Sequence, residues 1–182
     1  MKYYAVQVKT KSEENFLKIT RRKFQNQNIY EKTETKLVWP RRELTIRRKG
    51  VSVKNLAPIF PGYVFLGAEE FIPEIYWLLK GVDGFGKFLK NNTNIEPLSR
   101  TDTELLLHFL SYGEVVRESK AVFDENQRIQ ILDGPMKGLE GDIIKVDKRK
   151  GRAKVHLTLY ENSFLIDFGF TVLAPVRNSE EK

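Results

Sequence analysis

The chain has 182 residues, of which 41% are hydrophobic and 12% aromatic, a composition typical of a globular protein with one real core or two small ones. It contains no cysteine, which excludes disulfides, thiolate catalysis and cysteine-ligated zinc. The formal net charge is +7: residues 1–122 carry 21 basic and 14 acidic side chains, whereas residues 123–176 carry eight of each.

A basic excess of this size suits contact with the phosphates of a nucleic acid. The sequence has no run of 18 apolar residues, and its first residues do not resemble a signal peptide. We therefore expect a cytoplasmic protein that does not contact a membrane.

Residues 2–8 alternate between two faces in the manner of a β-strand. Ser12 is placed to cap a helix over residues 13–24, whose apolar side chains recur at helical spacing. The stretch 59–66 predicts a second strand that is apolar on both faces, so both faces should be covered.

The segment between these elements is β-prone and predicts a projecting hairpin with Lys49 and Gly50 near its tip. From Arg41 to Lys54, six basic residues stand against one acid, Glu43. Two interpretations remain open for this charge: a solvated surface loop, or a hairpin that contacts nucleic acid.

Two further helices are predicted before residue 112. Pro73 and Gly81 bracket a short apolar helix over residues 73–80. Ser99 and Asp102 form a variant of the capping box, which opens a helix that continues through Leu110.

Beyond residue 122 the helical periodicity ends, and short alternating runs predict strands at 127–132, 141–146, 153–159 and 164–168. Short strands with tight turns favour a small closed barrel of the SH3 type. The predicted fold class is therefore α+β: an α/β sandwich, with an antiparallel sheet flanked by helices, followed by a small all-β SH3-like barrel. The predicted divisions are a first domain at 1–112, a linker at 113–122, the barrel at 123–176 and a tail at 177–182.

Nothing in the sequence points to catalysis. His108 and His156 have no clustered acid pair beside them, and neither a phosphate-binding glycine loop nor a metal-ligand spacing occurs. We expect no catalytic residue, no metal site and no cofactor.

Two motifs resemble those of the NusG family of transcription elongation factors. The first is Phe60-Pro61-Gly62-Tyr63-Val64, which is similar to the F-P-G-Y-V motif of that family. The second spans residues 127–153 and resembles a KOW motif, with Gly134, Gly138 and Gly141 at turn positions. The resemblance covers roughly residues 2–175.

The resemblance implies an N-terminal NGN domain that binds the clamp helices of RNA polymerase, followed by a KOW domain that takes a second partner. It implies an accessible hydrophobic hollow in which Phe60 lies, although ordinary core packing is the alternative for each aromatic residue. The implied polymerase-binding residues, with Trp77 or Leu78 added by proximity, are Tyr3, Gln7, Phe60, Pro61, Gly62, Tyr63 and Trp77.

Basic residues around such a hollow are placed to meet upstream or non-template DNA. They are Arg21, Arg22, Arg41, Arg42, Arg47, Arg48 and Lys49. In the barrel, the residues implied to contact RNA or another partner are Lys145, Lys148, Arg149, Lys150, Arg152 and Tyr160, with a solvated hairpin as the alternative for the basic turn.

One departure from the family pattern bears on the barrel's partner. General family members carry aromatic-Gly-Arg near the end of the barrel, on the surface thought to meet Rho or ribosomal protein S10, whereas here Glu161 and Asn162 follow Tyr160. This difference argues against Rho and leaves nascent RNA, ribosomal protein S10 or another factor.

The resemblance therefore implies a monomeric elongation and antitermination factor, similar to the specialised antiterminators RfaH and LoaP in its basic barrel turn. The alternative is a ribosome-associated KOW protein that binds RNA and never contacts polymerase.

Overall fold

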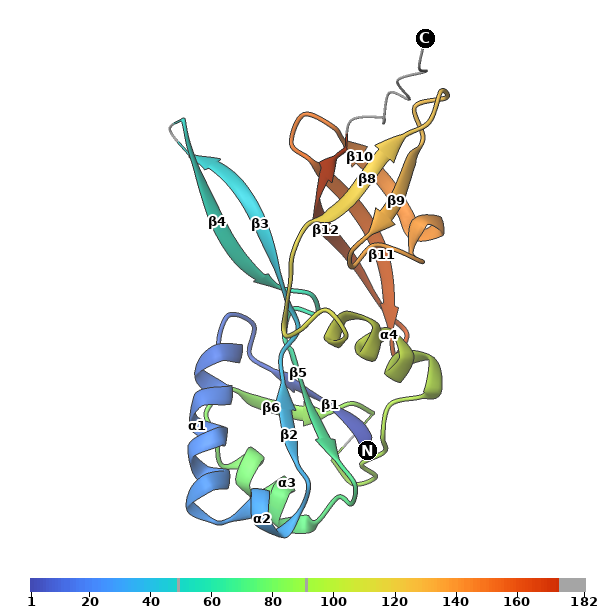
Figure 1. Ribbon diagram of the computed structural model, residues 1–182. Helices are drawn as coiled ribbons and strands as arrows, with labels where there is room; N and C mark the ends of the chain where they lie inside the picture. The colour runs from blue at the N-terminus through green and yellow to red at the C-terminus, as the bar shows by residue number, and fades with distance from the viewer. Residues whose placement is uncertain (49, 91, 174–182) are drawn as a thin grey trace. The chain divides into compact units, whose positions relative to one another are not determined.

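The computed structural model describes residues 1–48, 50–90 and 92–173, and of Arg47 and Arg48 only the backbone. The chain divides into two compact units (Figure 1). One unit comprises Met1–Arg41 and Pro58–Glu114; the other comprises Arg42–Ala57 and the residues from Val115 onward.

The first unit is built on a four-stranded antiparallel sheet with the order β2-β5-β1-β6. Its strands are β1 (Lys2–Val8), β2 (Lys36–Val38), β5 (Tyr63–Ala68) and β6 (Phe85–Phe88). The central strand β1 pairs with β5 in a register that places Ala5 opposite Phe65 and Gln7 opposite Tyr63. The predicted strands at 2–8 and 59–66 are therefore neighbours in one sheet.

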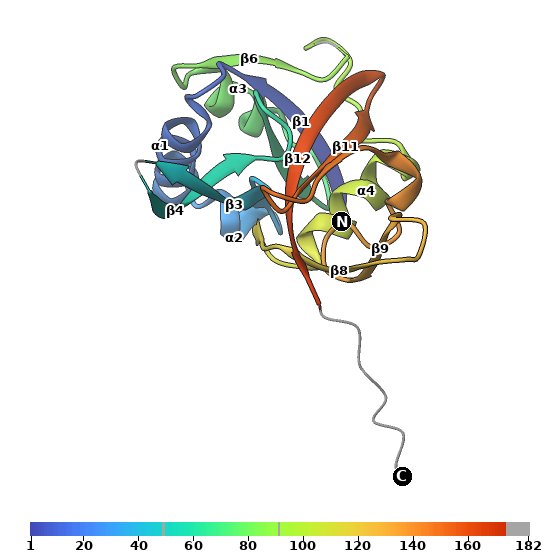
Figure 2. The same ribbon diagram turned by 90° about the horizontal axis from the view of Figure 1, so that it is seen from above.

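The helices of this unit are α1 (Glu13–Asn26), α2 (Ile29–Lys32), α3 (Pro73–Lys80) and α4 (Arg100–Leu110). One face of the sheet packs on α1 and α3, where Val6 and Val64 share a core with Phe16 and Ile75. α1 and α4 flank β1 from different sides (Figure 1 and Figure 2). The sequence predicted α1, α3 and α4, but not the single turn α2.

The capping box predicted at the start of α4 is confirmed. The Asp102 backbone N–H donates to Ser99 Oγ at 3.1 Å, and the Ser99 hydroxyl lies 2.7 Å from Asp102 Oδ2. These bonds satisfy a backbone donor that the first turn of a helix otherwise leaves without a partner.

The second unit contains a five-stranded sheet with the order β10-β11-β12-β8-β9. Its strands are β8 (Ser119–Phe123), β9 (Ile129–Asp133), β10 (Ile143–Asp147), β11 (Arg152–Leu159) and β12 (Asn162–Val172), with a 3₁₀ turn at Glu140–Asp142. β8 pairs with β12 in parallel, and the other neighbours are antiparallel. The four predicted barrel strands are confirmed, and their inner side chains, such as Val155 and Phe168, are buried.

The same unit contains the predicted hairpin, formed by β3 (Arg41–Arg48) and β4 (Val51–Pro58), with β7 (Val115–Val116) completing a three-stranded sheet. Gly50 has a φ of +82°, which glycine adopts without the penalty that a Cβ brings. Lys49, also placed near the tip by the sequence, lies outside the described residues.

The predicted domain boundaries differ from the structure in two places. The expected linker 113–122 contains β7 and most of β8, and β8 pairs with both β9 and β12. The hairpin, expected in the first domain, groups with the second unit. The sequence missed β8 because its polar residues concealed the strand pattern. The predicted tail 177–182 lies outside the described residues.

In the described part of the chain, no helix has the length and apolar character needed to cross a membrane.

Candidate functional site

The F-P-G-Y motif forms a tight turn that leads into β5. The Tyr63 N–H donates to the Phe60 carbonyl at 3.2 Å, with Pro61 second in the turn and Gly62 third at a φ of +81°. This is the residue order of a type II turn, in which the third position favours glycine. Pro61 is exposed to solvent, as expected of a residue at the outside of such a turn.

Glu13 holds this turn in place from the first turn of α1. Its Oε1 accepts a hydrogen bond from the Gly62 N–H at 2.8 Å, and the side chain is 2% exposed. On the other side of Gly62, its carbonyl accepts from the Val8 N–H at 2.8 Å. Nothing in the sequence indicated this role for Glu13, because a contact 49 residues away leaves no local pattern.

Phe60 does not lie in an accessible hollow, and the prediction that it does is wrong for this structure. Its side chain is 1% exposed. Its ring packs edge-on against Phe65 of β5 and Phe109 of α4, with centroid distances of 5.6 and 6.1 Å. Both neighbours are large apolar side chains, so Phe60 acts as a packing residue beneath the turn.

Tyr3, Gln7 and Tyr63 share the sheet face opposite α1 and α3, because strand residues two apart point the same way. Gln7 is half-buried, whereas Tyr3 and Tyr63 are 9% and 8% exposed. Burial raises the pKa of Tyr63, so its phenol remains neutral well above pH 7. Gln7 and Tyr63 thus lie opposite each other beside the Pro61 turn, whereas Tyr3 pairs with Gly67 near the other end of β5.

Trp77 lies elsewhere, and its grouping with the first strand is corrected by the structure. Ile75 and Leu79, on the same helix α3, are buried in the core on the other face of the sheet. Trp77 is 64% exposed on the outer side of that helix, with the Lys80 ammonium 5.0 Å from its ring centroid. The sequence could not show this separation. The residues of α3 are apolar nearly all round, so their pattern does not indicate which side of the helix faces the sheet.

A cavity of about 440 Å³ in the first unit gathers three of the basic residues that were predicted to meet DNA. Arg21 and Arg22 of α1 lie beside Arg41 at the start of β3, and Lys18 joins them. The full set of described lining residues is Glu14, Leu17, Lys18, Arg21, Arg22, Gln25, Trp39, Arg41 and Glu114.

Trp39 forms the aromatic wall of this basic cavity. The Arg41 guanidinium carbon lies 4.8 Å from the Trp39 ring centroid, a cation–π arrangement. Trp39 Nε1 and Arg41 Nε are both buried without a hydrogen-bond acceptor among the described residues. Arg21 is held in place by the Leu37 carbonyl at 3.1 Å and by Glu114 at 3.6 Å. The described lining has four cations against the carboxylates of Glu14 and Glu114, so the cavity is positively charged overall, as a phosphate ligand requires.

Arg42 does not line this cavity, and its role as a DNA contact stays a prediction. Its Nε donates to the backbone carbonyl of Asp167 at 2.6 Å within the second unit. Burial lowers the pKa of the guanidinium to about 10, although the Asp167 carboxylate opposes the shift. Arg42 remains charged at neutral pH and connects the hairpin to β12. The side chains of Arg47 and Arg48, and all of Lys49, lie outside the described residues.

The predicted partner residues of the barrel are divided between three places. Arg149, Lys150 and Arg152 surround one cavity with residues of the hairpin. Lys145 lines a smaller neighbouring cavity of about 190 Å³ together with Lys150 and Arg152.

The other two partner residues lie apart from this group. The Lys148 ammonium is 3.8 Å from the Phe123 ring centroid and bonds Gln127 Oε1. Tyr160 is at the opposite end of β11 from Arg152, with a φ of +48°.

Within residues 1–48, 50–90 and 92–173, no cluster of three or more histidine, aspartate or glutamate side chains is arranged to hold a metal ion.

The sequence and the fold of this chain are similar to those of known proteins. The family model described as Transcription termination factor nusG matches residues 1–107. Two relatives are named Transcription termination/antitermination protein NusG. The protein from Bacillus subtilis is 24% identical over 140 residues, which cover 75% of this chain and 77% of the relative. The protein from Haemophilus influenzae is 22% identical over 158 residues, which cover 86% of this chain and 85% of the relative.

A solved structure described as domain interaction in Thermotoga maritima NusG has the same fold, with a TM-score of 0.56 and 21% identity over 92% of this chain and 93% of that one. The matched relatives are named as transcription termination/antitermination proteins, and the match to the family model includes the Phe60-Pro61-Gly62-Tyr63-Val64 motif. The chain therefore belongs to the NusG family of transcription termination and antitermination proteins.

Proposed function

We propose that this protein binds the clamp helices of RNA polymerase through its first unit and promotes processive transcription. The observation that carries the proposal is the match of residues 1–107 to the NusG family, with the F-P-G-Y turn intact inside it. The proposed contact surface centres on the half-buried Gln7 and the exposed Pro61. Tyr3, Gly62 and Tyr63 are buried beside them and support this surface.

The mechanism follows from differential affinity. A factor that spans the clamp and neighbouring elements across the DNA channel binds the closed, translocating polymerase more tightly than the opened, paused form. Because a ligand shifts an equilibrium only by its difference in affinity for the two states, this preference suppresses pausing. The second unit then recruits nascent RNA, ribosomal protein S10 or another factor, and the outcome is that of an antiterminator.

The contact surface can be tested with a soluble fragment of polymerase that carries the clamp helices. Gln7→Ala combined with Tyr63→Phe removes the polar groups of this face but retains the buried Tyr63 ring. We expect the affinity for the fragment, measured by titration calorimetry, to fall at least about tenfold, equivalent to about 1.4 kcal/mol. Thermal unfolding of this variant should stay within a few degrees of the parent, about the shift expected from a loss below 1 kcal/mol.

Trp77→Ala is the matched control, because it removes an exposed aromatic side chain on α3, beyond the opposite face of the sheet. Its affinity for the clamp fragment should equal that of the parent chain. Normal binding by the Gln7 and Tyr63 double variant would contradict the assigned face, and failure of the parent chain to bind would contradict the proposed function.

We further propose that the cavity formed by Lys18, Arg21, Arg22, Arg41 and Trp39 holds phosphates of upstream or non-template DNA. The supporting observation is that these four cations line one cavity and outnumber the two carboxylates of its described lining, Glu14 and Glu114. Phosphate contacts of this kind position a protein on DNA without reading its sequence.

Lys18→Ala combined with Arg22→Ala tests the DNA contact, because both side chains are exposed and neither holds the fold. We expect affinity for a labelled DNA oligonucleotide at low salt to fall by about tenfold, since two phosphate contacts are lost. In a Trp77→Phe background Trp39 is the sole indole of the chain, so DNA binding at the cavity should also change its fluorescence. The double variant Lys2→Ala and Lys87→Ala removes the same charge elsewhere in this unit, and an equal loss there would overturn the assignment.

A further inference from the structure

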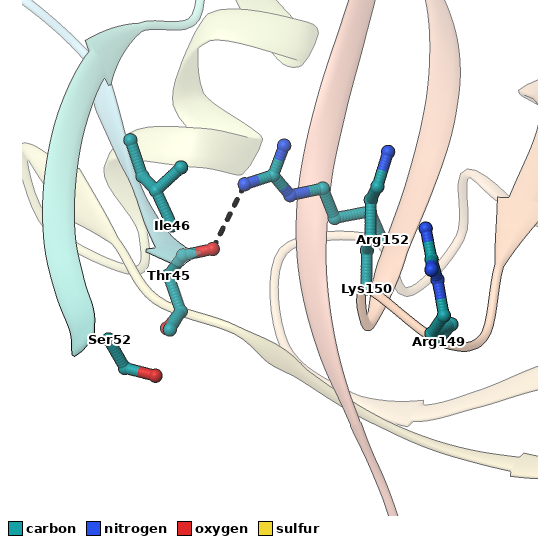
Figure 3. A pocket seen from close by; sticks show the side chains of 6 residues that line it. All are labelled: Thr45, Ile46, Ser52, Arg149, Lys150 and Arg152. Carbon is teal, nitrogen blue, oxygen red and sulfur yellow. Dashed lines mark hydrogen bonds between the residues drawn. The ribbon is translucent and has the colours of Figure 1, made fainter. Parts of the chain in front are cut away.

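A second basic cavity, of about 710 Å³, lies between the β3–β4 hairpin and the turn that joins β10 to β11. Both walls belong to the second unit. The described residues that line it are Thr45, Ile46, Ser52, Arg149, Lys150 and Arg152 (Figure 3). The hairpin thus supplies hydroxyl groups and one apolar side chain, and the barrel supplies three cations.

The two walls are joined by a hydrogen bond. Arg152 Nη2 donates to the Thr45 carbonyl at 2.9 Å, shown as a dashed line in Figure 3. The Nε atom of Arg152 is buried and lacks an acceptor in the described part of the chain. The Arg152 side chain therefore reaches from β11 to the hairpin and is fixed there by the Thr45 carbonyl.

The turn that carries the other two cations is also fixed. Asp147 Oδ1 accepts from the Lys150 backbone N–H at 3.0 Å, and the Gly151 N–H donates to the Lys148 carbonyl at 3.2 Å. Gly151 has a φ of +59°, and a Cβ at this position would lie 2.8 Å from the Phe170 carbonyl oxygen. Arg149 and Lys150 thus project from a backbone of defined shape.

The charge of this cavity is not balanced by its described lining. The smaller cavity beside it shares Lys150 and Arg152 but includes the carboxylates of Asp147 and Asp167. By contrast, the described lining of the larger cavity has three cations and no acid, although the Lys150 ammonium also lies 3.7 Å from Asp147 Oδ2. Glu118 contacts a lining residue: its Oε1 accepts from the Thr45 hydroxyl at 3.1 Å and its Oε2 from the Thr171 hydroxyl at 2.8 Å. Its single negative charge offsets only part of the three positive charges of the lining.

The chemistry of the walls selects a class of ligand. Arginine and lysine donors with nearby hydroxyl groups suit phosphate oxygens. The described lining contains no aromatic side chain on which a base could stack, so the contacts should follow the backbone and tolerate any sequence. We propose that the β3–β4 hairpin and the β10–β11 turn together form a binding site for the phosphodiester backbone of a nucleic acid strand.

This site deepens the proposed function, since it adds a nucleic-acid contact on the second unit, but it does not depend on the clamp-helix contact. Its test uses the free full-length chain without polymerase. A failure here therefore leaves the clamp titration unchanged, and a failure of that titration leaves this result unchanged.

The test measures binding of a labelled 20-nucleotide strand, made once as RNA and once as DNA of the same sequence. Binding is measured between about 50 and 200 mM salt, a range over which affinity that depends on phosphate contacts falls by orders of magnitude. Arg149→Ala with Lys150→Ala removes two cations from the cavity. We expect the slope of log affinity against log salt to become shallower by about 1.4 to 1.8. Equal effects on RNA and DNA identify the backbone alone, and a larger effect on RNA adds the 2′-hydroxyl; both support the site.

Two matched variants separate this cavity from general attraction to a basic protein. Lys120→Ala with Lys137→Ala removes the same charge from exposed residues of the same unit that line neither basic cavity, so its slope should stay close to the parent value. Ser52→Asp places a carboxylate in the hairpin wall and should weaken binding by about tenfold, whereas Ser52→Ala should change it by less than about twofold.

Equal losses in the two double-alanine variants would overturn the proposal, as would normal binding by Ser52→Asp. Inorganic pyrophosphate provides a further arm. If pyrophosphate displaces the strand at a concentration too low to act through ionic strength, the site binds a free phosphate compound. The proposed nucleic-acid backbone would then be the wrong ligand.

Discussion

Phe60→Ala is expected to lower the free energy of unfolding by about 3–5 kcal/mol, the usual cost of truncating a buried aromatic ring. The ring is 1% exposed and packs on Phe65 and Phe109, so its removal leaves a cavity between β5 and α4. The loss follows from the apolar area returned to water together with the contacts that the surrounding side chains cannot restore. Urea unfolding with hydrogen exchange in β1 and β5 would measure it.

The comparison with Trp77 distinguishes a packing residue from a contact residue. Trp77→Ala removes a larger ring that is 64% exposed, and its effect on stability should stay within about 0.5 kcal/mol. If Phe60→Ala also changed the free energy of unfolding by less than about 0.5 kcal/mol, the Phe60 ring would not be buried. That result would support the hypothesis that Phe60 itself contacts a partner. The expected pattern instead assigns Phe60 to support of the turn that presents Pro61 and Tyr63.

Gly134→Ala is expected to destabilise the second unit by about 2–5 kcal/mol. A Cβ at this position would lie 2.6 Å from the Ser119 Cα, and Gly134 has a φ of +103°. Two costs therefore combine: about 1–2 kcal/mol for a left-handed backbone at a residue with a side chain, and about 1–3 kcal/mol for overpacking against an element that cannot yield. Ser119 is fully buried and its Oγ accepts from the Met136 N–H at 3.1 Å, so β8 cannot move away freely.

Gly138→Ala is the control within the same motif. Gly138 also has a positive φ, +84°, but a Cβ there would meet no atom within 4 Å. Its cost should be the conformational part alone, about 1–2 kcal/mol. Hydrogen exchange in β8 and β9 would show both effects, and equal losses in the two variants would mean that the contact with Ser119 relaxes without cost.

The two glycines also explain why the KOW pattern could be recognised before the strands around it were known. Turn residues carry their reason locally, because a positive φ excludes most side chains wherever the turn lies in the fold. The partner that makes Gly134 intolerant of a Cβ is different: Ser119 belongs to β8, a strand that the sequence assigned to a linker.

In the candidate binding sites too, some features could be predicted from the sequence and others depended on the fold. Charge alone was sufficient to predict Arg21, Arg22 and Arg41 as nucleic-acid contacts, and in the structure all three line one cavity. Charge alone could not show that Arg42, next in the chain, turns instead to the Asp167 carbonyl. Neighbouring residues of a strand point to opposite faces, so one of two adjacent arginines can line a surface while the other is buried.

By itself, the sequence determined the local elements and their order: the strand periodicity of 2–8, the cap at Ser99, the helix bounded by Pro73 and Gly81, and the turns of both motifs. These features depend on backbone sterics and on hydrogen bonds between residues close in the chain. Together with the two motifs, they were sufficient to indicate the family.

Only the tertiary structure decided which apolar face is covered and by what. Phe60 and Trp77 are both aromatic residues beside strongly apolar segments, yet one is buried under α4 and the other exposed on α3. Burial depends on contacts between elements far apart in the chain, such as the hydrogen bond from Gly62 to Glu13, and no periodicity records those contacts. The accessible surface through which this protein acts is therefore a property of the packed fold.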